Sequence, residues 1–191
     1  MAMQIKIIDD VGKDIGCIDY SYLVKLGLRH QIVKLLIYCD KSRTVLLQQR
    51  SKCDDSCPGM WDNSASGHVD ANEDNLSAIV RETKEELGLK INFKKLKHIG
   101  DYNTEEKLKN GFLRRRTAIY LYLVDSTDIN IAINHKELEK IEWVDLCVVK
   151  KIVYEHDFVF KGDMLTKGLV KSIEMLLNDL NDSPVYSAKN V

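Results

Sequence analysis

The feature that most constrains this chain is the segment Asn75–Leu87, in which apolar side chains recur with the spacing of a helix. At about 100° per residue, one stripe of this helix carries Leu76, Ile79, Val80, Thr83 and Leu87. Gly88 follows at once, and glycine is the residue that most readily ends a helix in a left-handed conformation. The segment therefore predicts a helix that packs one stripe against a core.

The face beside this stripe carries three carboxylates, Glu82, Glu85 and Glu86. They stand in the last two turns, where the helix dipole favours cations, and Glu82 and Glu86 repel each other at i, i+4. Ala78 lies on the same face one turn earlier and leaves room there. Two interpretations stay open at this point: an ordinary solvated surface rich in Glu, or a cluster that binds a cation.

The residues before the helix favour the second interpretation. Gly67, Glu73, Arg81 and the three glutamates, with Gly88 after them, fit the spacing G-x5-E-x7-R-E-U-x-E-E-x-G-U, where U is a bulky aliphatic residue. This segment resembles the Nudix box, and all seven fixed positions match. Thr83 departs from the pattern at one U position, and we expect its hydroxyl to bond the carbonyl of Ile79.

The resemblance implies a Nudix pyrophosphohydrolase that cleaves a diphosphate linkage in a nucleoside diphosphate joined to another moiety. It implies Mg²⁺ or Mn²⁺ as cofactor, and clustered carboxylates suit these hard cations. The implied metal ligands are the Gly67 carbonyl, Glu73, Glu82, Glu85 and Glu86. The implied catalytic residues are Glu82, Glu85 and Arg81, with Arg81 orienting the glutamates.

A wider resemblance, over residues 7–50 and 58–68, is to the Nudix branch that includes type 1 isopentenyl-diphosphate isomerase and its hydrolase-like relatives. That isomerase needs a cysteine where this chain has Ser66, and two glutamates near residues 113–117, where this chain has three arginines. A serine is a poor acid at neutral pH, so these departures favour the hydrolase. The alternatives are an isomerase-like enzyme and a non-catalytic Nudix module that senses a nucleotide.

Four further residues are candidates for substrate binding: Arg50, His68, Arg114 and Arg116. Strand alternation places Arg114 and Arg116 on one face and Arg115 on the other, and a guanidinium fork suits a phosphate. An exposed strand protected by charge explains the arginines equally well. His30 is expected to be a structural hydrogen bonder, and Glu105 and Glu106 are either general bases or part of a flexible loop.

The remaining chain predicts interleaved strands and helices, which indicates an α/β class: a Nudix-type α/β/α sandwich with a mixed β-sheet. Strands are expected at residues 5–8, 15–18, 31–39, Thr44–Arg50, 61–69, 95–102, 113–124 and 141–144, with a charged segment at 103–111. Helices are expected at residues 20–26, Asn75–Leu87, Leu146–Tyr154 and 164–180, the last capped by Asp163. We expect one domain over residues 1–180, including an N-terminal hairpin and short helix extension at 1–30, and a flexible tail at 181–191.

Composition limits the partners. The chain is 45% hydrophobic with a formal net charge of −1, so it gives no strong signal for nucleic acid or membrane, and a cytoplasmic protein that binds a small diphosphate is expected. The odd number of cysteines, five, and their wide spacing argue against a disulfide framework, and Cys53 and Cys57 are the only close pair. A homodimer is compatible with the sequence.

Overall fold

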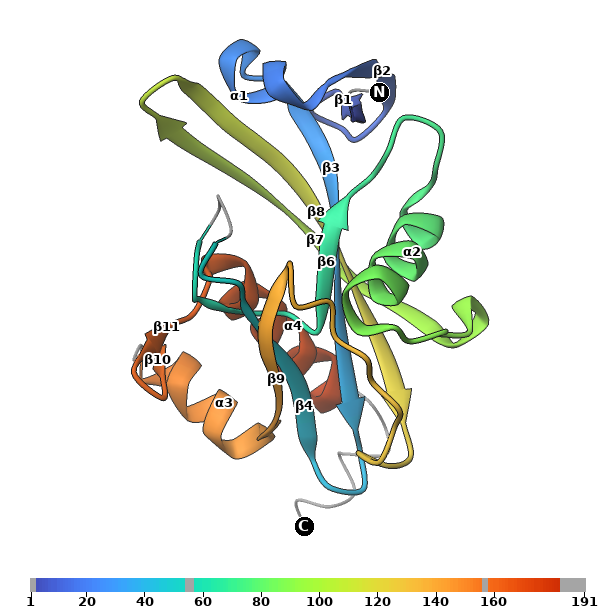
Figure 1. The fold of residues 1–191 in the computed structure, drawn as a ribbon, viewed down its shortest axis with the longest axis vertical. Coiled ribbons are helices and arrows are strands. Elements are labelled where there is room, and N and C mark those ends of the chain that lie inside the picture. Colours follow the sequence, from blue (N-terminus) through green and yellow to red (C-terminus); the bar gives the residue numbers. More distant parts are fainter. Residues whose placement is uncertain (1–2, 54–56, 156–157, 183–191) are drawn as a thin grey trace.

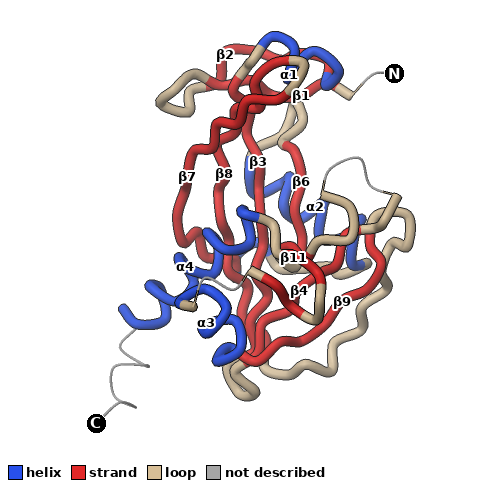
Figure 2. Tube along the Cα trace, turned by 90° about the vertical axis from the view of Figure 1, so that its left-hand side faces the viewer, coloured by secondary structure: helices blue, strands red, loops and turns tan. Residues whose placement is uncertain are grey.

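The computed structural model describes residues 3–53, 57–155 and 158–182. Within these residues the chain forms one mixed sheet of nine strands, whose long central strands overlap edge-on in Figure 1 and are spread out side by side in Figure 2. The strands are β1 (Gln4–Ile8), β2 (Asp14–Asp19), β3 (Arg29–Cys39), β4 (Thr44–Arg50), β5 (Trp61–Asp62), β6 (Ala65–His68), β7 (Leu96–Leu108), β8 (Gly111–Val124) and β9 (Leu138–Asp145). A separate two-stranded ribbon joins β10 (Val159–Phe160) to β11 (Asp163–Met164).

Strand β3 organises the sheet. One edge of β3 pairs in parallel with β8 from end to end, and its other edge is shared between two antiparallel strands. Residues 32–35 pair with β6, whereas residues 37–39 pair with β4. Strands β4 and β6 therefore share one edge of β3 and separate from each other. Among the described strands, β6 pairs with β3 alone. This divergence leaves the outer edge of β6 open to side chains from other elements.

Helices cover both faces of the sheet, as the sequence predicted. Helix α2 (Asn75–Leu87) lies on one face, and α3 (Leu146–Tyr154) and α4 (Lys167–Asp182) lie on the other (Figures 1 and 2). Three short helical segments complete the fold: η1 (Tyr20–Tyr22), α1 (Leu23–Leu26) and η2 (Phe93–Lys95). The α/β/α sandwich with a mixed sheet is thus confirmed.

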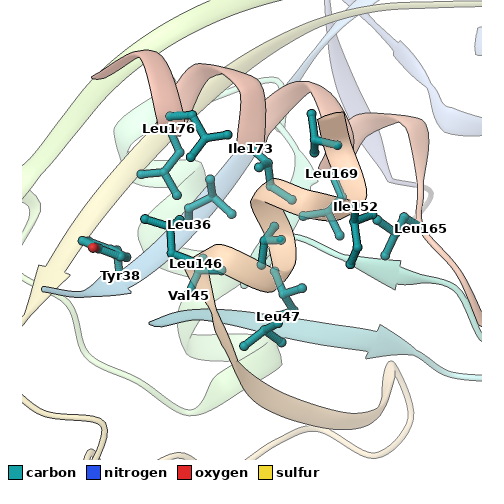
Figure 3. Close-up of a cluster of buried hydrophobic side chains, with 14 of the residues drawn as sticks. Leu36, Tyr38, Val45, Leu47, Leu146, Ile152, Leu165, Leu169, Ile173 and Leu176 are labelled. Carbon is teal, nitrogen blue, oxygen red and sulfur yellow. The ribbon is translucent and has the colours of Figure 1, made fainter. Parts of the chain in front are cut away.

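Alternation along β3 divides the apolar core into two. Val33, Leu35 and Ile37 face α2 and pack with Ile79 and Leu87. Leu36 and Tyr38 face the other way and pack under α3 and α4, where Figure 3 shows the side chains meeting. The labelled side chains of this second core include Val45, Leu47, Leu146, Ile152, Leu165, Leu169, Ile173 and Leu176. The same alternation directs successive side chains of each neighbouring strand either towards α2 or towards the opposite face of the sheet.

Two predicted boundaries are wrong. The charged segment 103–111 is not a separator, because β7 runs to Leu108 and β8 begins at Gly111, so that Glu105 pairs with Arg114 within one long hairpin. Helix α4 begins at Lys167, and Thr166 caps it by accepting from the Leu169 N–H at 3.1 Å. Asp163 is in β11 instead. Of the predicted tail, residues 181 and 182 belong to α4, and 183–191 lie outside the described residues.

Candidate functional site

Helix α2 forms over the predicted residues. Asp74 caps its first turn by accepting from the Ser77 N–H at 2.7 Å, and Gly88 ends it with φ of 66°. Thr83 donates its hydroxyl to the Ile79 carbonyl at 2.6 Å, as predicted. The buried face of α2 is rotated from the predicted stripe towards the glutamates. Leu76 of the predicted stripe is 39% exposed, whereas a second row of side chains beside the stripe is buried. That row consists of Ala78, Glu82 and Glu86.

The Glu82 carboxylate lies directly over Gly67, the first residue of the box motif. A Cβ atom added to Gly67 would stand 1.9 Å from the Glu82 carboxyl carbon, so only glycine fits beneath this side chain. Glu82 is 7% exposed. Burial raises its pKa to about 7, with Glu85 and Glu137 adding to the effect and Arg81 opposing it.

Glu86 occupies the open edge of β6. Its Oε2 accepts from the Ser66 backbone N–H at 2.9 Å, and its Oε1 accepts from Gln48 of β4 at 3.4 Å. The side chain is 4% exposed, and burial, together with the charges of Glu82 and Glu137, raises its pKa well above the ordinary range. Two of the three carboxylates on this face of α2, Glu82 and Glu86, are therefore buried, which excludes the solvated-surface interpretation for them.

Arg81 joins the carboxylates into one network. Its Nη1 donates to Glu82 at 2.7 Å and to Glu85 at 3.0 Å, while its Nη2 donates to Glu73 at 2.5 Å and to the His68 carbonyl at 2.9 Å. Burial alone would lower the pKa of this guanidinium, but the bonds to Glu73 and Glu82 raise it. Glu73 also accepts from the Asp70 N–H at 2.9 Å, which fixes it between the loop and the helix. The single guanidinium of Arg81 is thus shared by three carboxylates.

The donor set suits a hard divalent cation, although it is not gathered around one point. Among the described residues, no three His, Cys, Asp or Glu side chains already form a metal-binding group, because Arg81 stands between Glu82 and Glu85. The Glu85 side chain is 51% exposed. Burial raises the pKa values of Glu82 and Glu86, and for Glu82 it does so despite Arg81. Oxygen donors in this number suit Mg²⁺ or Mn²⁺.

A fifth carboxylate near the cluster, Glu137, was missed from the sequence. It lies just before β9, where its side chain accepts from Asn134 at 2.7 Å and its carbonyl accepts from the Ser51 N–H at 2.8 Å. Its charge adds to the raised pKa of both Glu82 and Glu86. Glu137 reaches the site only because β9 pairs with β4, and no local sequence motif predicts that pairing.

The predicted substrate-binding residues fall in three places. His68 is in β6, one residue after Gly67, and Arg50 ends β4 with its Nη1 at 3.7 Å from Asp62. Arg114 pairs with Glu105 at 3.1 Å and Arg116 with Asp101 at 3.6 Å. No contact between these two arginines and the α2 carboxylates occurs within the part of the chain that the structure describes.

His30 has the buried position expected of a structural residue, at 1% exposure. Its Nδ1 lies 3.4 Å from the Leu28 carbonyl, and its ring stacks on His68 with centroids 5.2 Å apart. Burial lowers the pKa of His30 to about 4 and that of His68 to about 3, so both rings are neutral at pH 7.

Comparison with known proteins adds independent findings. The NUDIX domain family model matches residues 28–160. Isopentenyl-diphosphate Delta-isomerase of Aliivibrio fischeri (strain MJ11) is 25% identical over 146 residues, which cover 75% of this chain and 80% of that protein. Nudix hydrolase 3 of Arabidopsis thaliana is 42% identical over 65 residues, which cover 34% of this chain and 8% of that protein.

Solved structures share the fold. DR0079 from Deinococcus radiodurans superposes with a TM-score of 0.62 at 17% identity, over 90% of this chain and 97% of that one. The MutT protein from Methanosarcina mazei Go1 has a TM-score of 0.61 at 19% identity, over 81% and 96% respectively. None of the helices in the described residues is both long enough and apolar enough to cross a membrane.

Proposed function

Because this chain belongs to the Nudix family, we propose that it is a metal-dependent pyrophosphohydrolase acting on a diphosphate linkage between a nucleoside and a second moiety. The observation that carries the proposal is the burial of Glu82 and Glu86 against β6 with their pKa values raised. Glu86 has no cation among its described hydrogen-bond partners, and Glu82 shares its one cation, Arg81, with Glu73 and Glu85, so these buried carboxylates are costly to the fold. Such a cluster is explained by a cation that arrives with the substrate or before it.

The residues that would hold Mg²⁺ or Mn²⁺ are Glu82, Glu85, Glu86 and the Gly67 carbonyl, with Glu73 in support. A bound divalent ion supplies charge neutralisation for the diphosphate oxygens and lowers the pKa of a water molecule. Glu73 does not meet Glu82 directly, since its oxygens accept from Arg81 and from the Asp70 N–H. Its part is to hold Arg81 in place.

Arg81 positions the carboxylates. A side chain that donates to Glu73, Glu82 and Glu85 at once fixes the rotamers of all three. Glu86 is fixed separately, by the Ser66 N–H and Gln48. The carboxylates are therefore oriented by the protein before any ligand binds, which lowers the ordering cost of binding one.

An isomerase acting on isopentenyl diphosphate is the second candidate, because relatives with that name cover most of the chain. Ser66 argues against it, since a hydroxyl cannot protonate an alkene near neutral pH as an acidic group could. The arginines at 114–116 argue in the same direction, because they bring cations to the strand where that isomerase has its acidic partner.

The deciding experiment offers the purified protein a panel of nucleoside diphosphates linked to sugars, nucleosides or alcohols, with Mg²⁺ or Mn²⁺, and measures product release. We expect hydrolysis that a chelator abolishes and that Glu85→Gln strongly reduces. Glu139→Gln is the matched control, because Glu139 is an exposed glutamate of β9 away from α2.

Isopentenyl diphosphate forms a second arm of the same assay. Allylic isomer formation without hydrolysis would replace the proposal with the isomerase. Binding of a nucleotide with no turnover of any substrate would replace it with a sensing module.

A further inference from the structure

Strand register places a second polar cluster on the sheet face opposite α2. His30 of β3 pairs with Arg115 of β8, and Ile32, two residues along, pairs with His68 of β6. Residues two apart on a strand share a face, so Arg115, His30 and His68 project to the same side. Ser66 of β6 and Lys34 of β3 are also directly paired and share this face. We call Arg115, His30 and His68 the β8–β6 cluster.

Arg115 differs from the arginines beside it. Arg114 donates to Glu105 and to the Gly27 carbonyl, and Arg116 pairs with Asp101 and donates to the Val11 carbonyl. Arg115 makes no ion pair or hydrogen bond with any of the described residues, and its Nε is buried without a partner. Burial accordingly lowers the pKa of this guanidinium. A largely buried guanidinium without an anion is costly, and that cost calls for a ligand.

The one described carboxylate whose charge is known to act on Arg115 does not fill this role. Asp62 acts on Arg115 through its charge, but its Oδ1 accepts from Lys34 at 2.6 Å and from Thr166 at 2.9 Å. Arg50 lies 3.7 Å from the other oxygen of Asp62. The carboxylate is thus committed to other groups, and Arg115 keeps its hydrogen-bonding capacity for something else.

The two imidazoles add unused polar atoms to the cluster. The Nε2 atoms of His30 and His68 are buried and have no hydrogen-bond partner within the described chain. The ring of Tyr20, from η1, closes the other side of His68 in an edge contact with centroids 5.2 Å apart. Polar atoms left unsatisfied in one place indicate a site that is completed by a bound group.

The cluster adjoins the carboxylate site through β6. Ser66, Gly67 and His68 are consecutive, and the Ser66 N–H bonds Glu86 while the His68 carbonyl accepts from Arg81. A ligand at the open edge of β6 can therefore extend from the carboxylates to the opposite face. We propose that the β8–β6 cluster binds an oxyanion, a phosphate or carboxylate, carried by the second moiety of the substrate. This inference rests on the proposed function.

The first test measures binding of inorganic phosphate in a chelator, so that hydrolysis plays no part. Phosphate should raise the melting temperature of the wild type in a saturable way, compared with sodium chloride at equal ionic strength. Arg115→Gln should weaken phosphate binding at least about tenfold, because it removes the charged fork. Arg115→Lys, which keeps the charge, should retain part of the binding.

The matched controls are Arg114→Gln and Arg116→Gln, which remove equal charge from paired arginines on the other face. Both should bind phosphate as the wild type does. Without phosphate, Arg115→Gln should melt at the same temperature as the wild type or higher. Equal phosphate binding by Arg115→Gln and the wild type, or none by the wild type, overturns the proposal.

The second test distinguishes a substrate group from a free anion. ADP-ribose and ADP-ribose phosphate, which differ by one phosphate on the second sugar, are compared for binding in chelator. The wild type should bind the phosphorylated member at least about tenfold more tightly, and Arg115→Gln should lose this preference. Equal affinities in the wild type overturn the assignment to substrate. Failure of the proposed function would appear separately, as no hydrolysis of any member of the nucleoside diphosphate panel with Mg²⁺ or Mn²⁺.

Discussion

Two buried charged clusters flank the central sheet, and they are balanced differently. Beneath α4, Asp62 accepts from Lys34, Thr166 and its neighbour's N–H. Burial alone would raise the pKa of Asp62, but Lys34 and Arg50 lower it below its ordinary value. Beneath α2, Glu82 and Glu86 have raised pKa values despite Arg81. The first cluster is neutralised by cations of the protein itself, whereas the second, under the proposed function, is completed by a divalent cation.

Asp62→Ala should have the largest effect, because it leaves the Lys34 ammonium buried without its anion and removes the partner of the Thr166 cap. The free energy of unfolding should fall by about 3–5 kcal/mol, measured by urea denaturation. The double variant Lys34→Met, Asp62→Leu should recover most of this loss. If the free energy of unfolding of Asp62→Ala lay within about 1 kcal/mol of the wild-type value, roughly the contribution of an exposed ion pair, Asp62 would not stabilise the fold. It would then resemble Glu82 and Glu86.

Glu86→Gln should show the opposite behaviour. The hydrolysis rate should fall by about a hundredfold or more, the effect of losing one electrostatic element of a site. In a chelator the variant should be as stable as the wild type or more so, because it removes a buried charge.

Added Mg²⁺ should raise the melting temperature of the wild type through ligand linkage, and raise that of Glu86→Gln less. A variant with full activity and the full Mg²⁺ response would remove Glu86 from the site.

The pH dependence of the free energy of unfolding tests whether the buried imidazole of His30 is neutral in the folded protein. The pKa of His30 is about 4 in the folded protein and near 6.5 when exposed. The unfolded chain therefore binds the proton first, and this residue stabilises the fold above about pH 6.5 and loses that contribution as pH falls towards 4. Between pH 8 and pH 5 we expect His30 to account for a loss of about 2 kcal/mol.

His30→Gln should reduce this loss, as measured by urea denaturation at each pH. His135→Gln, at an exposed position, should leave it unchanged. Parallel curves for the wild type and His30→Gln would contradict a depressed pKa.

Thr83→Val should have the smallest effect. The Thr83 hydroxyl is buried but satisfied by the Ile79 carbonyl, so replacing it with a methyl group exchanges a small hydrogen bond for apolar contact. We expect a change in unfolding free energy within about 1 kcal/mol and no change in rate. A larger loss, or a changed rate, would show that α2 depends on this bond for its position.

Local patterns predicted most of the fold. The helix Asn75–Leu87, the strand Thr44–Arg50 and the helix Leu146–Tyr154 were found to the residue, because hydrophobic periodicity and capping residues mark them. The hairpin arm around Glu105 was missed, since an exposed strand of charged residues has no apolar alternation. Asp163 was predicted as the cap because aspartate suits that role, but Thr166 suits it too, and only the structure shows Thr166 in place, with its hydroxyl bonded to Asp62.

The candidate site was predictable only where it follows one segment. The spacing that resembles the Nudix box predicted a common site for Gly67, Glu73, Arg81 and the three glutamates. Glu137 could not be found in this way, because strand pairing brings it to the site from more than fifty residues away. Alternation did separate Arg115 from Arg114 and Arg116, but it did not reveal which face lies next to Ser66.

The missing side chain at Gly67 also constrains the order in which this protein can change. Any Cβ there would overlap the Glu82 carboxylate, so Gly67→Ala is harmful only while residue 82 is large. A lineage that kept the fold but abandoned the site would lose Glu82 first, and Gly67 would become free to vary afterwards. The reverse order requires an intermediate with a displaced carboxylate. Tolerance at position 67 thus depends on the residue at position 82, and a mutational scan should find Gly67→Ala harmful in the wild type and neutral in a Glu82→Ala background.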